Sequence, residues 1–442
     1  MKKTKNSKKL IFLDQTYRFF QEPSFWWTTG VDQPHCYALI SVDNGETHLF
    51  AEKQPEVSKV WMTVLEVPDY LQQFEIDHAY YHEDLATKVK ELDPKLLIIS
   101  KGGKNPYSKV GPVYPDFPWM ADYYVNGGHL YTILNEIRLR KTDEELVLIR
   151  EAVKRGVDAH IFVMKNIKPG MNESHMQTLF RFMSRWFDHA AVSPYEEIVG
   201  GGKNAAVLHY HDDNQTLKDG DVVLMDMGVK TNYYCSDITT NLPVNGKFTE
   251  KQAQIYNVCL KANREIIKNA KAGINYQELQ IIGEKVILQG LLDLGLYLNP
   301  DNETLEQLWE KRIIYTFFPH GIGHYIGLYV HDPPGDPKFE FQGRPIKKQN
   351  MRIRRVLEEN MCVTIEPGIY FIEGLLTQAK EDEALTKYFD WEKVDAYKKE
   401  IQGVRVEDNI RILADGVELF TKKLPRTVEE IEAVMAGGEW ST

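Results

Sequence analysis

Four acidic side chains lie in segments that otherwise have the composition of buried strands. Asp226 ends the apolar run 222–225, and Asp237 follows it in a second run rich in β-branched and aromatic residues. Glu366 in CVTIEPGIYF and Glu407 in GVRVEDNIRIL repeat this arrangement nearer the C-terminus. A carboxylate removed from water is costly unless it is paired or binds a metal. The four residues are therefore candidate metal ligands, although a single one of them would be better explained as a turn cap or a solvated side chain.

The first acidic pair predicts a β-hairpin. Residues 222–228 and 233–242 both have strand composition, and a short polar link joins them. A turn centred on 231–232 would place Asp226 directly opposite Asp237. Like charges opposite one another on a sheet repel, and a multivalent cation between them would turn that repulsion into coordination.

Three histidines lie close together in PHGIGHYIGLYVHDPPGDP, namely His320, His324 and His331, and a fourth, His209, precedes the first acidic strand. The spacing of the first two resembles H-E-x-x-H, but glycines make a helix improbable there and the glutamate is missing, which argues against a zincin. Two Asp, two Glu and one or more His form an oxygen-rich ligand set that suits Mn²⁺ or a similar ion. Two divalent ions would neutralise four carboxylates and form a hydrolytic centre.

An internal repeat indicates that the acidic pairs belong to two similar halves. The segment KNIKPGMNESHMQ (165–177) aligns with KNAKAGINYQELQ (268–280) at an offset of 103, with six of thirteen positions identical. Each copy follows a predicted long helix and opens a second helix after a Gly-x-Asn turn. Duplication is the interpretation that we prefer, and a chance match is the alternative. Halves folded face to face would bring all four carboxylates into one central cleft.

The start of a long amphipathic helix marks the predicted domain boundary. Thr142 and Glu145 have the spacing of a capping box at its N-terminus. The boundary is placed just before it, which gives an N-terminal α/β domain at 1–135 and a catalytic domain at 136–442. The first domain contains a predicted hairpin, CYALISVDNGETHLF, and a predicted buried strand, PKLLIIS.

Composition narrows the class of protein. The net charge of −11 argues against a general binder of nucleic acid or of anionic membranes, because both need a basic face. No apolar run approaches the ~20 residues of a membrane helix. The apolar run at 10–13 is too short for a signal peptide. The four cysteines are scattered, which fits a reducing compartment and argues against a thiolate zinc site. We therefore expect a cytoplasmic protein.

The acidic and histidine motifs together resemble those of the pita-bread metallopeptidases, a family that includes methionine aminopeptidase, aminopeptidase P, prolidase and creatinase. The family's ligands occur in the order Asp, Asp, His, Glu, Glu. Here that order falls on Asp226 (LMDMG), Asp237 (CSDIT), His324 (HGIGH), Glu366 (TIEPG) and Glu407 (RVEDN). The resemblance implies an α+β fold, in which a duplicated catalytic domain follows the smaller N-terminal α/β domain, and two divalent ions, most simply Mn²⁺.

Within this family the chain resembles the eukaryotic type of prolidase, which cleaves Xaa-Pro dipeptides. The segments AVLHY, SDIT, PHGIGHYIGLYVHD, EPGIYF and FQEPSFWWTTGVDQPHCYALISVDNG carry the resemblance over nearly the full length. It implies that Asp237 and Glu407 bridge the metals, that Asp226 completes one site, and that His324 and Glu366 complete the other. Two loops depart from the family pattern: Glu-Asn replaces Pro-Gly before CVTIEPG, and HDPPGDP replaces HDVGG.

The same resemblance assigns the remaining roles. Glu366 would act as the general acid and base, and His209 and His331 would line the substrate pocket and assist catalysis. Arg352 would bind the proline carboxylate, and Arg405 would be a second substrate-binding arginine. The partner implied is a small dipeptide, with no nucleic acid and no membrane.

Other functions remain open at this stage. An aminopeptidase P-like enzyme would share the metals but accept longer substrates, and creatinase or organophosphate hydrolysis is possible on the same fold. A non-catalytic binding module would be expected to have lost ligands, and this chain keeps all five. A homodimer is expected from the family and from the aromatic cluster Phe25-Trp26-Trp27, which offers much apolar area for a small domain.

Overall fold

The computed structural model describes residues 19–101, 103–106, 109, 111, 113–339 and 351–440. The short apolar run at 10–13 lies outside the described residues. The chain divides into two compact units, Met1–Lys104 with Val110–Tyr131 and Asn105–Lys109 with Thr132–Thr442. The predicted boundary near residue 135 falls within helix α4, Leu130–Arg138. The assignment of an N-terminal and a catalytic domain on either side of that residue stays a prediction.

The smaller unit is built on a three-stranded sheet in the order β1-β2-β3. Strands β1 (Cys36–Ile40) and β2 (Thr47–Ala51) form the hairpin predicted from the alternating pattern, and Gly45 takes the left-handed conformation in the connecting turn, at φ 78°. Strand β3 (His78–Tyr81) pairs with β2 in parallel. Leu49 and Phe50 of β2 are fully buried, so the central strand carries the core of this unit.

Three helices accompany this sheet: α1 (Pro23–Thr29), α2 (Val67–Gln73) and α3 (Leu85–Leu92). The segment PKLLIIS was predicted to be a buried strand, and it does contain a strand, although a shorter and more exposed one. Only Leu97–Ile98 form strand β4, paired in parallel with β5 (Val125–Asn126), and Ile98 is 42% exposed. The amides of Leu97 and Ile99 donate to the carbonyls of Tyr124 and Asn126, so the pairing is real and the error lies in the expected burial.

The first half of the larger unit begins with the predicted long helix, α5 (Asp143–Asn166). The capping box is confirmed: the Thr142 hydroxyl accepts a hydrogen bond from the Glu145 amide, and the Glu145 carboxylate accepts one from the Thr142 amide. The other elements of this half are α6 (Glu173–Trp186), β6 (Ile198–Gly201), β7 (Val222–Asp226), β8 (Lys230–Thr231), β9 (Tyr234–Cys235) and β10 (Thr239–Pro243). Strand β7 lies between β10 and β6.

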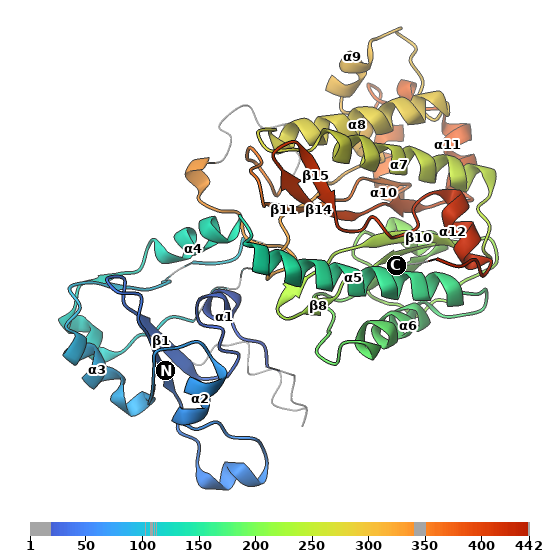
Figure 1. Cartoon of the computed structure of the whole chain (residues 1–442). Helices are drawn as coiled ribbons and strands as arrows, with labels where there is room; N and C mark the ends of the chain where they lie inside the picture. Colours follow the sequence, from blue (N-terminus) through green and yellow to red (C-terminus); the bar gives the residue numbers. More distant parts are fainter. Residues whose placement is uncertain are drawn as a thin grey trace. The chain divides into compact units, whose positions relative to one another are not determined.

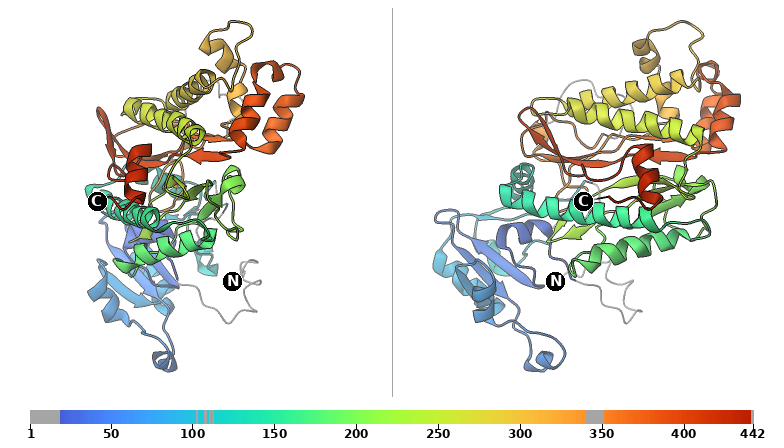
Figure 2. Two further views of the ribbon diagram at one scale, coloured as in Figure 1. Left: turned by 90° about the vertical axis from the view of Figure 1, so that its right-hand side faces the viewer. Right: turned by 45° about the vertical axis from the view of Figure 1, so that its right-hand side comes forward.

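The second half repeats this build and then extends it. Its elements are α7 (Glu250–Asn269), α8 (Tyr276–Asp293), α9 (Leu305–Glu310), β11 (Cys362–Ile365), β12 (Gly368–Tyr370), α10 (Glu373–Glu381), α11 (Trp391–Lys398), β13 (Gly403–Arg405), β14 (Asp408–Leu413), β15 (Gly416–Leu419) and α12 (Val428–Met435). Strand β14 lies between β11 and β15, while β12 pairs with β13. Figure 1 shows strands β10, β11, β14 and β15 between helix α5 and the helix pair α7/α8, and Figure 2 shows the same layers from two further sides.

The structure supports duplication over a chance match for the internal repeat. Asn172 and Asn275, which are 103 residues apart, are the N-cap residues of α6 and α8. Gly170 and Gly273, two residues before them, both take left-handed conformations, at φ 90° and 87°. Each repeated segment therefore makes the same turn between a long helix and the next one.

Within the described ranges, no helix combines the length and the apolar character needed to cross a bilayer.

Candidate metal centre

The first acidic hairpin has a different register from the predicted one. Its turn lies one residue later, at Asn232 and Tyr233, which have φ angles of 46° and 69°. Asp226 consequently lies opposite Thr239 and not opposite Asp237. Two left-handed residues form the type of turn that matches strand twist, and Asn adopts this conformation readily. Side chains alternate along a strand with a period of two, so the two-residue shift leaves both aspartates on one face.

In the second hairpin the two acidic residues do lie opposite one another. Ile365 pairs with Asp408 and Gly368 pairs with Arg405, and this register places Glu366 opposite Glu407. The hairpin ladder is interrupted at this point. The Glu366 amide donates to the Ile322 carbonyl at 2.8 Å, and the Glu407 amide donates to the Thr239 carbonyl at 3.3 Å. The second contact ties the second half of the unit to β10 of the first.

All five predicted ligands converge. Asp226, Asp237 and Glu407 form one group in which a ligand atom of each lies within 4.8 Å of the others, and His324, Glu366 and Glu407 form a second such group. The Nε2 atom of His324 lies 3.2 Å from Asp237 Oδ2 and 3.6 Å from Glu366 Oε1. The two halves thus contribute side chains to one continuous cluster, in which Glu407 belongs to both groups.

The electrostatics of this cluster fit bound cations. Burial, followed by repulsion from a neighbouring carboxylate, raises the pKa values of Asp237 and Glu407 well above the usual range. Burial and the neighbouring Glu407 do the same to the pKa of Glu366. Carboxylates this close cannot all ionise unless positive charge is placed among them. An oxygen-rich donor set with one imidazole is suited to hard divalent ions.

Tyr195 is a member of the site that the sequence did not reveal. Its hydroxyl lies 2.8 Å from Asp226 Oδ1 and 2.6 Å from Asp237 Oδ1. It is the type of outer partner that orients ligating carboxylates. Tyr195 lies in the loop before β6, 31 residues before Asp226. No spacing or motif connects it with the acidic strands, so only the fold identifies it.

Arg405 lies beside Asp226 and is buried, with 4% of its surface exposed. Its guanidinium donates to Asp226 Oδ2 at 2.6 Å, to the Tyr370 hydroxyl at 2.9 Å and to the Thr239 hydroxyl at 3.0 Å. These bonds hold Asp226 in place from the opposite half of the unit. The substrate contact that was expected of Arg405 stays a prediction.

The other three residues predicted to contact substrate surround the same cluster. The rings of His331 and His324 meet edge to face with centroids 4.4 Å apart, and Asp237, His324 and His331 also form a compact ligand group. Burial, and then the charge of Arg405, lowers the pKa of His209. The positive charge of Arg352 further lowers the pKa values of His209 and His331, so Arg352 acts electrostatically at this site.

Asp332, next to His331, is held by two cations that the sequence did not suggest. Arg138 Nη2 lies 2.6 Å from Asp332 Oδ1, and Lys141 Nζ lies 3.2 Å from Asp332 Oδ2. All three side chains are almost fully buried. A buried carboxylate that is paired on both oxygens fixes the backbone around it, so this cluster positions the loop that carries His331.

One loop departure has a structural explanation. Asn360, which stands where the family pattern has glycine, takes a left-handed conformation at φ 66°. Asparagine tolerates this region better than most residues. Its side-chain oxygen accepts a hydrogen bond from Arg411 Nε at 2.9 Å, and its amide donates to the Ile412 carbonyl. The turn before the Glu366 strand is therefore kept in spite of the substitution.

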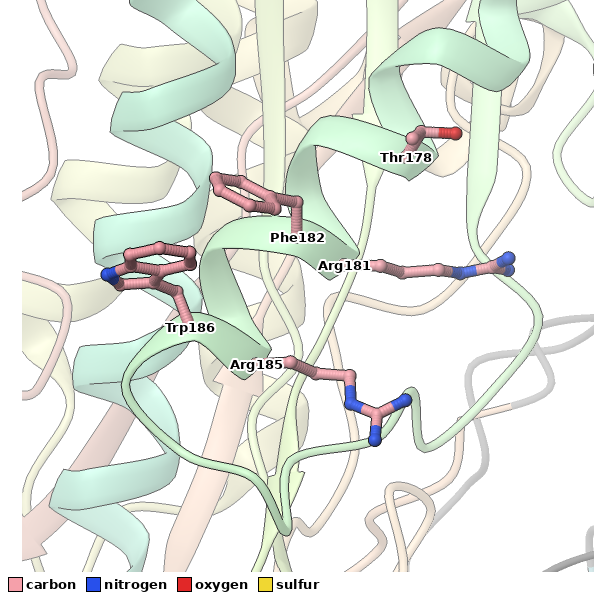
Figure 3. Close-up of a pocket in the computed structure, with 5 residues that line it drawn as sticks. All are labelled: Thr178, Arg181, Phe182, Arg185 and Trp186. Atoms are coloured by element: carbon pink, nitrogen blue, oxygen red, sulfur yellow. The ribbon is translucent and has the colours of Figure 1, made fainter.

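A separate hollow lies on α6, away from the acidic cluster. It has a volume of about 450 Å³ and is lined by Thr178, Arg181, Phe182, Arg185 and Trp186. Figure 3 shows the two aromatic rings beside one another and the two arginines directed to the other side. Arg181 is bonded to Glu197 at 2.8 Å. The lining offers neither a carboxylate nor an imidazole, so this hollow is not a candidate metal site.

Comparisons with known proteins agree with this geometry. Residues 147–414 match metallopeptidase family M24, and residues 4–96 match the aminopeptidase P N-terminal domain. The mouse Xaa-Pro dipeptidase is 35% identical over 431 residues, which cover 96% of this chain and 86% of that protein. The human Xaa-Pro dipeptidase is 33% identical over 426 residues, which cover 95% and 85%.

The solved structure of Pseudomonas aeruginosa aminopeptidase PepP is similar with a TM-score of 0.77 and 27% identity, covering 97% of this chain and 91% of that one. The family resemblance and the α+β pita-bread fold that the sequence predicted are thereby confirmed. The chain belongs to metallopeptidase family M24.

Proposed function

We propose that this chain is a Xaa-Pro dipeptidase, which hydrolyses the bond before a C-terminal proline with the help of two divalent ions. The observation that carries the proposal is the sharing of Glu407 between the Asp226–Asp237 group and the His324–Glu366 group. A carboxylate shared in this way is suited to bridge two ions. The mouse and human relatives, both Xaa-Pro dipeptidases, support the choice of substrate.

In this proposal each ligand has a defined place. Asp237 and Glu407 would be shared by the two ions, Asp226 would complete the first site, and His324 and Glu366 would complete the second. Mn²⁺ would suit this ligand set, because carboxylates dominate it. When bound, they would supply an activated water and polarise the scissile carbonyl.

Glu366 is the proposed general base and acid. Among the five ligands it is bound loosely by the protein, with the Thr364 hydroxyl at 3.4 Å and His324 Nε2 at 3.6 Å. Burial and Glu407 raise its pKa, which favours acceptance of a proton. We propose that it takes a proton from the attacking water and delivers it to the proline nitrogen as the bond breaks.

The remaining residues bind and orient the dipeptide. Burial keeps His331 and His209 neutral at neutral pH, since it lowers both pKa values. A neutral imidazole still has one N–H, which can donate to the oxygen of the tetrahedral intermediate. Arg352 binds the proline carboxylate through its planar fork of donors. An end-binding arginine of this kind would restrict the enzyme to dipeptides.

A second candidate is an Xaa-Pro aminopeptidase that accepts longer peptides, and the similarity to the Pseudomonas enzyme favours it. To separate the two, the protein is treated with a chelator, restored with Mn²⁺ and assayed on Gly-Pro, Ala-Pro and Ala-Pro-Ala. The dipeptidase proposal expects cleavage of both dipeptides and little of the tripeptide. Comparable rates on the tripeptide would favour the second candidate, and no cleavage of any substrate would overturn both.

We also infer a cytoplasmic homodimer in which the smaller unit reaches the active site of the partner. In support of a reducing compartment, the four cysteines are free in the described chain. In support of self-association, Phe25, Trp26 and Trp27 of α1 are each only partly buried. A monomeric mass by light scattering at micromolar concentration would refute the dimer.

A further inference from the structure

Two histidines of the smaller unit lie side by side on adjacent strands. Strands β2 and β3 run in parallel with His48 paired with His78 in the register. The two rings are stacked, with centroids 4.6 Å apart and an angle of 26° between their planes. Side chains at paired positions on one face of a sheet lie next to each other, so the pairing of β2 with β3 is what brings the two rings together.

His48 is buried, and neither nitrogen of its ring is hydrogen-bonded within the described residues. Only 4% of the residue is exposed. Leaving a buried polar group unsatisfied costs on the order of 1–3 kcal/mol. Such a group calls for an explanation, and a role as a metal ligand is one of them.

Glu46 completes a ligand set around this ring. Its Oε2 lies 3.9 Å from His48 Nε2, and its side chain is 45% exposed. One ligand atom from each of Glu46, His48 and His78 can be chosen so that all lie within 4.8 Å of one another. Because the Glu46 side chain is partly exposed, an ion could reach this group from solvent.

We propose that Glu46, His48 and His78 form a second metal site, which binds one imidazole-preferring divalent ion of the Zn²⁺ type. Two imidazoles and one carboxylate are a known ligand set for Zn²⁺ and leave the fourth tetrahedral position for water. This donor set differs from the carboxylate-rich cluster around Glu407, which suits a harder ion. The proposal does not depend on the peptidase activity.

Burial keeps the His48 ring neutral and therefore available as a ligand. Burial, then the neighbouring His78, lowers its pKa; Lys88 acts in the same direction, while Glu46 and Asp77 act in the opposite one. The ring is therefore neutral at neutral pH, the form that binds metal. Asp77 is engaged elsewhere, because its Oδ2 accepts a hydrogen bond from the Thr47 amide at 2.8 Å.

The competing explanation is packing alone. His48 also stacks on Tyr80, with centroids 6.1 Å apart, so the two histidines could be members of an aromatic layer. That explanation accounts for the stacking but leaves both nitrogens of a buried ring unsatisfied. It also gives no reason for the Glu46 carboxylate to lie beside them.

The test counts Zn²⁺ on the full-length protein by equilibrium dialysis and elemental analysis. Wild type is compared with His78→Gln and Glu46→Gln, both of which alter partly exposed ligands and leave the buried His48 ring in place. His189→Gln, which changes an exposed histidine of the larger unit, is the matched control. We expect each ligand variant to bind one Zn²⁺ fewer per chain than wild type, or to bind it more than about tenfold more weakly. The control should bind the wild-type number.

Two results would overturn the proposal. One is an unchanged Zn²⁺ number and affinity in His78→Gln, which would reduce the two histidines to packing residues. The other is an equal loss in His189→Gln, which would show that the additional ion binds nonspecifically to exposed histidines. Circular dichroism of each variant verifies that the fold is retained. A failure here leaves the ion count of the Glu407 cluster, which Asp237→Asn tests, unaffected.

Discussion

In the first half of the larger unit the helix α5 leads through Gly170 into α6, and in the second half α7 leads through Gly273 into α8 by the same path. The Gly170 amide donates to the Leu217 carbonyl at 2.8 Å, and the Gly273 amide donates to the Leu357 carbonyl at 2.9 Å. These contacts bind each turn to the segment that precedes the first acidic strand of its own half. The backbone frame is therefore common to both halves, and the differences lie in the side chains.

One difference concerns the side chain by which each long helix supports the acidic strands. His160 of α5 lies 3.0 Å from the carbonyl of Met227, the residue after Asp226. At the offset of 103, α7 has Asn263, whose amide donates to the Ile365 carbonyl at 3.1 Å and to the Val406 carbonyl at 3.3 Å. Both side chains bind backbone next to a predicted ligand, but only the histidine can gain a proton.

The other difference concerns the acids themselves. Asp226 receives hydrogen bonds from Tyr195 and Arg405, whereas Glu366 has only distant protein donors. Tyr195 of the first half and Arg405 of the second thus hold Asp226 in place, whereas Glu366 is held only weakly, which suits the proton exchange proposed for it. Duplication accounts for the backbone that the two halves share, and the differences between their acidic residues come from the side chains around them.

The largest effect is expected from Asp237→Asn. This residue belongs to one ligand group with Asp226 and Glu407, and to another with the histidines of the second half. We expect loss of the dipeptidase activity by roughly a thousandfold or more, in line with the loss of a group that acts as part of a unit. Metal content should fall from two ions per chain. Full activity with two bound ions would contradict the dinuclear assignment and leave the halves independent.

Arg352→Ala tests whether a side chain of the second half binds the proline carboxylate of the substrate. Loss of a charge-assisted pair in a partly desolvated pocket costs on the order of 2–4 kcal/mol, or roughly thirty- to a thousandfold in kcat/KM. The loss should be large for Ala-Pro and much smaller for Ala-Pro-amide, which lacks the carboxylate. Arg354→Ala is the matched control. Equal losses on the two substrates would make Arg352 structural and favour the aminopeptidase candidate.

His160→Asn gives the first half the side chain that the second half uses. Burial, with a contribution from Arg426, lowers the pKa of His160 from 6.5 to about 4. Because the folded pKa is the lower one, the stability linked to His160 is complete above pH 6.5 and is lost as the pH falls towards 4. The loss amounts to roughly 3 kcal/mol.

The measurement is urea unfolding of metal-free wild type and His160→Asn at several pH values. Titrating carboxylates contribute to both proteins and cancel in the difference. The variant should be less stable at pH 7.5 and should lose roughly 3 kcal/mol less than wild type between pH 7 and pH 4. Parallel curves for the two proteins would show that His160 titrates normally and that the halves respond alike to acid.

Tyr195→Phe removes the donor that distinguishes the first acidic pair from the second. We expect metal affinity to fall about 10- to 100-fold, the usual effect of losing an outer partner of a ligand. Tyr210→Phe is the control, because its hydroxyl donates to Glu173 at 3.0 Å, outside the cluster. Unchanged metal affinity in Tyr195→Phe would mean that Asp226 and Asp237 are held by the strands alone.

Tyr195 also marks the limit of what could be predicted from the sequence. The four carboxylate ligands could be identified because each lies in an apolar, strand-like segment of the sequence, where a carboxylate needs a reason to be present, and because the repeat indicated a second acidic pair. His324 could be selected among the histidines only through the family resemblance. The repeat also identified both helix turns. Residues that act through the fold, such as Tyr195 and Asp332, lie in loops where a polar residue is ordinary.

The hairpin register shows why some details were out of reach. Turn position depends on which residue adopts a left-handed conformation, and Tyr233 does so at φ 69° although its type disfavours it. Asp226 and Asp237 still lie on one face of the sheet, as predicted, only because the partner of Asp226 shifted by two residues. A shift of one would have sent Asp226 and Asp237 to opposite faces.

The smallest effect is expected from the caps that the two halves share. The Asn172 side chain accepts a hydrogen bond from the Ser174 amide at 3.0 Å, and the Asn275 side chain accepts one from the Gln277 amide at 3.1 Å. Replacing such a cap with alanine typically costs about 1 kcal/mol. Asn172→Ala and Asn275→Ala should therefore lower stability by similar amounts.

The two substitutions should also add in the double variant, because the caps belong to different helix turns and share no partner. Asn172→Asp and Asn275→Asp keep a side-chain acceptor and should restore most of the loss. Urea unfolding at pH 7.5 gives all of these values. If replacing one of these asparagines with alanine left the stability unchanged, the turn in that half would be held only by the hydrogen bond from the glycine amide to the leucine carbonyl. The shared frame would then be a backbone feature, and the repeated asparagine would be a remnant of duplication without a present role in stability.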